Sequence, residues 1–101
     1  MNAKMGDGMT ALMFASFSGH QEVVRALLHA EADINAKAGD GRTALMLASQ
    51  EGYQEVARVL LDAKADVNTK MGDGHTALIA ASNSSHQEVV QLLKGAGAGE
   101  P

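Results

Sequence analysis

The sequence contains no cysteine and no tryptophan, and its only aromatic residues are Phe14, Phe17 and Tyr53. Without cysteine the chain has neither a disulfide framework nor a thiolate metal site. Three aromatic side chains are too few for base stacking on nucleic acid. Eight Lys and Arg against twelve Asp and Glu give a net charge of −4, which offers little attraction for a phosphate backbone. We therefore expect no nucleic-acid partner.

Long hydrophobic runs are also missing. No segment approaches the roughly 18 apolar residues that a membrane span needs. The N-terminal residues 1–4 lack the apolar core of a signal peptide. We expect no membrane association and an intracellular, cytoplasmic location. With 46% hydrophobic and 20% charged residues, the 101-residue chain has the composition and length of one folded domain, which we expect to span residues 1–101.

The sequence is dominated by an internal repeat. The pattern Lys-x-Gly-Asp-Gly-x-Thr-Ala-Leu begins at Lys4, at Lys37 and at Lys70, so successive copies are offset by 33 residues. Self-similarity at such a period is typical of repeat architectures. It predicts three contiguous units, at residues 3–35, 36–68 and 69–101, the last of which frays at about 95–101.

Each unit has the pattern turn, helix, turn, helix. The Gly-Asp-Gly segments have turn composition, and Thr10, Thr43 and Thr76 stand where a helix N-cap belongs. The second helix of each unit opens with Gln-Glu and carries an apolar stripe. Helices shorter than ~12 residues are marginal alone, so the units must stack side by side. The predicted fold is an all-α solenoid, with these stripe residues: Val23, Val24, Leu27, Leu28; Val56, Val59, Leu60, Leu61; Val89, Val90, Leu92, Leu93.

Residues 41–68 resemble an ankyrin repeat. They read GRTALMLASQEGYQEVARVLLDAKADVN, against the family pattern G-x-T-P-L-H-x-A-A-x-x-G-H-x-E-V-V-x-L-L-L-x-x-G-A-D-V-N. The family's proline, its histidine and the glycine after its second helix are replaced here by Ala44, Met46 and Lys64. The last replacement, and Glu31 in the first unit, predict left-handed residues that cost ~1 kcal/mol each. We expect the family's fold with a less stable stack.

The two ends of the stack carry their own expectations. Terminal repeats normally present polar outer faces. The first unit is expected to expose Leu12, Val23 and Leu27 instead, which allows self-association through uncapped ends. Phe14 is expected in the core. Phe17 aligns with positions that face solvent in the family, and is a candidate interface anchor.

No motif indicates catalysis or a cofactor. Gly6-x-Gly8 lacks the preceding strand of a dinucleotide site, and Asp7 and its copies lack the ligand ladder of a calcium loop. The four histidines, His20, His29, His75 and His86, form no i, i+4 pair for zinc. His20 and His86 stand at the family's Gly-His position and are expected to be partly buried, with a packing and hydrogen-bonding role. We predict a protein that is not an enzyme and binds no metal or cofactor.

The resemblance implies a protein-interaction module of the scaffold or adaptor type, which binds another protein or peptide on a concave surface of turn tips and first helices. The alternative is a structural, self-associating stack, or an engineered or excised fragment without a partner of its own. The variable position before the threonine (Met9, Arg42, His75) is where specificity is expected. Carried over by position, the surface comprises Lys4, Asp7, Met9, Phe17 and Ser18; Lys37, Asp40, Arg42, Gln50 and Glu51; Lys70, Asp73, His75, Asn83 and Ser84.

Overall fold

The computed structural model describes residues 9–97, which form six α-helices and no strand. The predicted all-α class is therefore confirmed for this part of the chain. The helices come in three pairs joined by short turns, and the pairs are connected by longer loops. Their bounds are α1 Ala11–Ser18, α2 Gln21–His29, α3 Ala44–Glu51, α4 Gln54–Asp62, α5 Ala77–Asn83 and α6 Gln87–Gly95.

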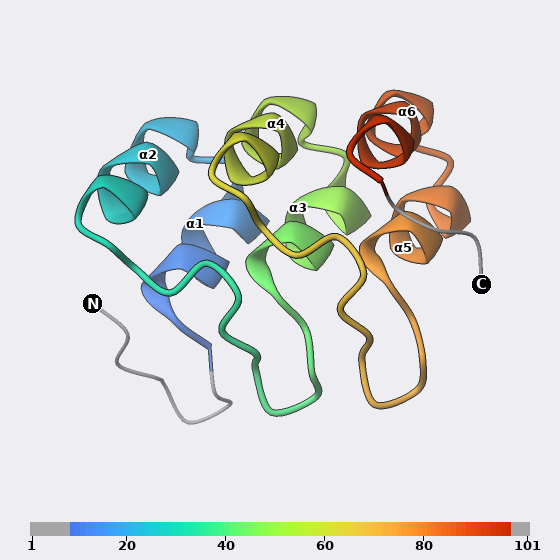
Figure 1. The fold of residues 1–101 in the computed structure, drawn as a ribbon, viewed down its shortest axis with the longest axis horizontal. Coiled ribbons are helices and arrows are strands. Elements are labelled where there is room, and N and C mark those ends of the chain that lie inside the picture. Colours follow the sequence, from blue (N-terminus) through green and yellow to red (C-terminus); the bar gives the residue numbers. More distant parts are fainter. Residues whose placement is uncertain (1–8, 98–101) are drawn as a thin grey trace.

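The three helix pairs stand side by side in chain order (Figure 1). The first helices of the pairs, α1, α3 and α5, form an inner row, and α2, α4 and α6 form an outer row. The loops that leave α2 and α4 pass beneath the inner row and project to the side opposite the outer helices. Each pair contacts its neighbours in the row, so the molecule is a linear stack.

Threonine caps start the inner helices, as predicted. The side-chain oxygens of Thr10, Thr43 and Thr76 each accept a hydrogen bond of 3.3 Å from the backbone N–H three residues later. This satisfies one of the backbone donors that a helix leaves free at its start. All three threonines are buried, so each cap also fixes the helix end against the core.

Left-handed residues end the helices. Gly19 and Gly52 follow the first two inner helices with φ of 75° and 77°, and Ser85 takes the same place after α5 with φ of 61°. After the outer helices, Glu31 and Lys64 have φ of 66° and 73°, which confirms the prediction made for them. The third unit has Gly97 there, with φ of 97°. The position therefore requires a left-handed backbone whichever side chain it carries.

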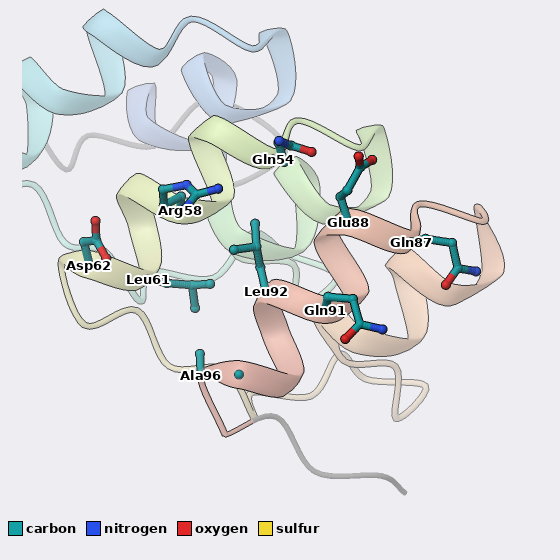
Figure 2. A pocket seen from close by; sticks show the side chains of 10 residues that line it. Gln54, Arg58, Leu61, Asp62, Gln87, Glu88, Gln91, Leu92 and Ala96 are labelled. Carbon is teal, nitrogen blue, oxygen red and sulfur yellow. The ribbon is translucent and has the colours of Figure 1, made fainter.

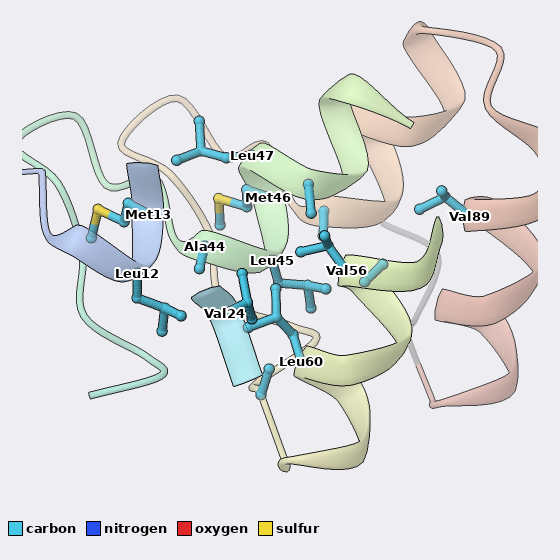
Figure 3. Close-up of a cluster of buried hydrophobic side chains, with 14 of the residues drawn as sticks. Leu12, Met13, Val24, Ala44, Leu45, Met46, Leu47, Val56, Leu60 and Val89 are labelled. Carbon is cyan, nitrogen blue, oxygen red and sulfur yellow. The ribbon is translucent and has the colours of Figure 1, made fainter. Parts of the chain in front are cut away.

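The core runs through all three units, between the two rows of helices (Figure 3). Leu12 belongs to it and is buried, so the expectation that it would be exposed is wrong. Its counterparts Leu45 and Leu78 are also buried, which shows that this position packs within its own helix pair. Phe14, expected in the core, is instead 42% exposed. Its counterpart Leu47 is buried in the middle unit, so this position is covered by a neighbouring unit.

Direct contacts tie each unit to the next. The side-chain oxygen of Asn35 accepts a hydrogen bond from the backbone N–H of Asp66, at 2.8 Å. This joins the turn after α2 to the turn after α4. The rings of Tyr53 and His86 pack over Gly19 and Gly52 of the unit before them.

Candidate partner-binding surface

The loop tips of the second and third units have the same backbone geometry. The N–H of Ala38 donates to the carbonyl oxygen of Arg42 at 2.8 Å, and the N–H of Gly41 donates back to Ala38 at 2.9 Å. Gly41 has φ of 91°, the left-handed conformation that glycine adopts without strain. The third unit repeats this turn with Met71, Gly74 and His75. Both tips are therefore well-defined turns that present their side chains in the same way.

An aspartate holds the variable residue at each of these tips. One oxygen of Asp40 accepts the backbone N–H of Arg42 at 3.2 Å, and the other lies 2.7 Å from its guanidinium Nε. Asp73 binds His75 in the same way, with 2.8 Å between carboxylate and ring Nδ1. Each aspartate is therefore paired with the position expected to confer specificity.

These pairs also set the protonation of the aspartates. Slight burial raises the pKa of Asp40, but hydrogen bonds from the backbone and side chain of Arg42, together with its charge, outweigh that effect and lower it. The pKa of Asp73 is lowered by hydrogen bonds from the backbone and then the side chain of His75. Both carboxylates are therefore ionised at neutral pH. A ligand carboxylate that approaches Arg42 must compete with a charge already there.

The two tips lie against each other. The N–H of Gly72 faces the carbonyl oxygen of Asp40 at 3.5 Å, and a Cβ added to Gly41 would lie 3.0 Å from the Cα of Met71. The structure thus brings Arg42 and His75, on adjacent tips, onto one surface. Lys37 and Lys70 are exposed on the same two loops.

The ends of the inner helices supply the rest of the predicted surface. Phe17 is 41% exposed, which confirms its expected exposure. Ser18, Asn83 and Ser84 are exposed. Gln50 and Glu51 are half-buried, and their side chains face each other at 3.4 Å.

Three of the predicted surface residues need separate comment. Met9 is buried with the core, so it does not present its side chain to a partner as expected. It precedes the capping Thr10, which is itself buried. Lys4 and Asp7 lie outside the described residues.

Sequence reasoning missed a groove between the outer helices α4 and α6 (Figure 2). It has a volume of about 870 Å³, and a smaller hollow of about 290 Å³ lies between α2 and α4. Leu61 and Leu92, both predicted to face the core, are half-buried and line the larger groove. The remaining lining residues are Gln54, Arg58, Asp62, Gln87, Glu88, Gln91, Gly95 and Ala96.

Residues 9–97 contain no group of three or more His, Asp or Glu side chains placed to hold a metal ion. Over the same range, no helix has the length and apolar character that crossing a membrane requires.

The repeated segment matches two protein-family models. The model described as ankyrin repeats (3 copies) matches residues 37–99, and the model of a single ankyrin repeat matches residues 7–38. A search of curated proteins returned no match. Ankyrin repeats are in general protein–protein interaction modules. With well over half of its length matched and three stacked helix pairs in register with the repeat, the chain belongs to the ankyrin-repeat family.

Proposed function

We propose that this chain is a non-catalytic interaction module of the scaffold or adaptor type, acting inside the cell. Its partner would bind an inner surface formed by the loop tips and the ends of the inner helices. The observation that carries the proposal is the contrast between a constant framework and variable positions on the surface. Capping threonines and turn glycines recur in each unit, whereas Phe17, Gln50 and Asn83 differ at one equivalent position, and Arg42 and His75 at another.

The framework gives this surface the rigidity that binding requires. Two adjacent turns fix the loop tips, and buried caps fix the starts of the inner helices. A rigid surface loses little conformational entropy when a partner binds. Phe17 offers a large apolar contact, and Arg42 offers a cation already oriented by Asp40.

The charges on this surface favour an extended peptide as the partner. Lys37 and Asp40 lie on one loop, and Lys70 and Asp73 on the next. Both signs of charge therefore recur from loop to loop. A peptide crossing the loops would meet this repeated pattern, and complementary charges would fix its register.

A peptide-display selection tests the proposal. Random linear peptides are selected on the 101-residue chain, and the affinity of the selected peptides is measured by calorimetry for Phe17→Ala and Arg42→Ala. Neither side chain belongs to the buried core, so circular dichroism should show unchanged helix content. We expect at least one variant to lose about tenfold in affinity, the effect of removing an interface anchor.

Arg58→Ala is the matched control, because Arg58 is an exposed arginine on the outer helix α4. It should leave the affinity unchanged. Peptides that bind both inner-surface variants at full strength would contradict the proposal. If only Arg58→Ala weakened binding, the site would be the groove between α4 and α6.

A further inference from the structure

The groove between α4 and α6 is an enlarged copy of the hollow between α2 and α4. Every residue that lines the smaller hollow has its counterpart, 33 residues later, in the lining of the groove. At one of these positions the side chain is lost, because Gly95 takes the place of Asp62. A Cβ added to Gly95 would meet no atom within 4 Å, so the groove is open at this point.

The groove extends along the whole of both helices. Its lining begins at Gln54, the first residue of α4, and reaches Asp62, the last. At 1.5 Å per residue, a helix of this length spans ~13 Å. Most of the polar side chains in the lining are exposed, so the groove is an open trough and not the enclosed pocket that small molecules favour. A trough between two helices accepts the ridge of side chains on a third helix.

Leu61 and Leu92 supply the apolar part of the groove and lie between the two helices (Figure 2). Leu61 packs against the core, as does Val59, the counterpart of Leu92 in the second unit. Leu92 itself is half-buried and is not among the side chains of residues 9–97 that pack against the core. The first unit has Ala26 at this position, so the fold does not require a large apolar side chain there. Leu92 is therefore available to contact an occupant of the groove.

The charges that remain free in the groove are negative. Arg58, the one arginine or lysine in its lining, has its Nε 3.7 Å from a carboxylate oxygen of Glu55. Asp62 and Glu88 are exposed, and neither carboxylate makes a hydrogen bond or ion pair within the described part of the chain. Asp62 ends α4 and Glu88 lies in the first turn of α6, so these two carboxylates stand toward opposite ends of the groove (Figure 2).

The position of Asp62 is unfavourable for an anion. The C-terminal end of a helix carries partial negative charge, which a basic residue offsets. α2 and α6 have His29 and Lys94 in their last turns, whereas the last turn of α4 has no basic residue. A cation bound beside Asp62 would supply the missing positive charge. The groove is therefore complementary to an occupant with an apolar face and basic groups at its ends.

We propose that the groove between α4 and α6 binds a basic amphipathic helix of a partner protein. An apolar stripe on that helix packs against Leu61 and Leu92, and a lysine or arginine at each end of the stripe pairs with Asp62 or Glu88. The chain's own residues 98–101 do not match this groove in charge, because they include Glu100 and no basic residue. The site goes beyond the proposed function, since it lies on the outer helices and does not use the loop tips.

A titration followed by two-dimensional ¹H–¹⁵N NMR tests this inference. The probe is a blocked helical peptide of about 15 residues, made of alanine, leucine and lysine, with leucines on one face and a lysine at each end of the leucine stripe. We expect the amide signals of α4 and α6 to shift. The affinity should be at least about tenfold higher than for the same peptide with glutamate in place of lysine. Equal affinity for the two peptides, or shifts confined to other helices, would overturn the proposal.

Two variants of the groove sharpen the test. Leu92→Ala introduces the residue that the first unit has at this position, so helix content should not change, and we expect about tenfold weaker binding of the lysine peptide. Glu88→Gln should weaken binding about threefold. Its matched control is Glu22→Gln, which removes the same charge from the equivalent exposed position of the first unit and should have no effect. Full affinity in Leu92→Ala would contradict the proposal.

Two further observations separate this site from its alternatives. Phe17→Ala and Arg42→Ala should bind the lysine peptide at full strength, so a failure of the inner-surface proposal is distinguishable from a failure of this one. Nuclear Overhauser contacts between the Leu92 methyl groups and Pro101 in the free protein would show that the chain's own last residues fill the groove, and would reject the partner helix.

Discussion

At the scale of single residues, two buried hydroxyl groups stand out. The Oγ atoms of Ser16 and Ser49 are buried and have no hydrogen-bond partner among the described residues. A buried polar group without a partner costs roughly 1–3 kcal/mol. Both serines lie on inner helices, at the position where the family pattern has alanine. Replacing either serine with alanine should therefore remove this cost without changing the backbone conformation.

We predict that Ser49→Ala raises the free energy of unfolding by about 1 kcal/mol. The substitution removes the unsatisfied hydroxyl and adds a residue of higher helix propensity. Urea denaturation followed by circular dichroism measures the change. Ser82→Ala is the control, because Ser82 is exposed in the third unit and should change stability by less than about 0.5 kcal/mol. A less stable Ser49→Ala variant would show that the hydroxyl has a partner.

Single residues also show where sequence reasoning fails. Exposure of Phe17 was predicted correctly, but Leu12, Phe14 and Met9 were each assigned to the wrong environment. Whether a residue on a short helix faces its own pair or the neighbouring unit depends on how the helix is rotated in the stack. An apolar pattern does not encode that rotation. The pairing of Asp40 with Arg42 was missed too, although residues two apart in a tight turn could have suggested it.

At the scale of elements, two structural features meet at the residue that ends each inner helix, and both favour glycine there. Its backbone is left-handed, and its Cα lies beneath a ring from the next unit in the first two cases. Glycine meets both requirements in Gly19 and Gly52. Ser85 adopts the same left-handed backbone, but as a residue with a Cβ it does so at a strain of ~1 kcal/mol.

We predict that Ser85→Gly raises the free energy of unfolding by about 0.5–1 kcal/mol, since relief of strain exceeds the added entropy of the unfolded chain. The reciprocal change, Gly52→Ser, should cost more than Ser85→Gly gains. It introduces the same strain and also places a Cβ against His86. Chemical denaturation at low micromolar concentration compares the two. The interpretation fails if Ser85→Gly is neutral or destabilising.

Helix boundaries were the most predictable feature of the elements. Threonine caps, left-handed ends and turn glycines act over three or four residues, so the sequence around each of them is sufficient evidence. The stripes on the outer helices were predicted less well. Leu92 was expected in the core but is half-buried and lines the groove between α4 and α6. Leu61 packs against the core as expected, and it also lines this groove.

At the scale of the whole molecule, burial is greatest in the middle of the stack. In α3, the six consecutive residues from Ala44 to Ser49 are buried, whereas α1 buries four residues and α5 three. Each unit gains stability mainly from its neighbours, and only the middle unit has one on both sides. The ends should therefore open before the centre.

Amide hydrogen exchange tests this order. At low micromolar concentration, we predict the slowest exchange in α3 and faster exchange in α1 and α5. Exchange in α5 that is slower than in α3 would contradict the order. Equal rates in all inner helices would indicate that the stack opens as one unit.

The two contacts in which a ring packs over a glycine of the unit before it have a consequence for how the chain can change in length. Tyr53 packs over a glycine of the unit before it, and Gly52 receives a ring from the unit after it. Tandem duplication of residues 36–68 would create one new junction, with a tyrosine ring over Gly52, which is a contact that the protein already makes at Gly19. Recombination between similar segments of its coding sequence could therefore lengthen the protein by a whole repeat and add a new set of variable surface positions at once.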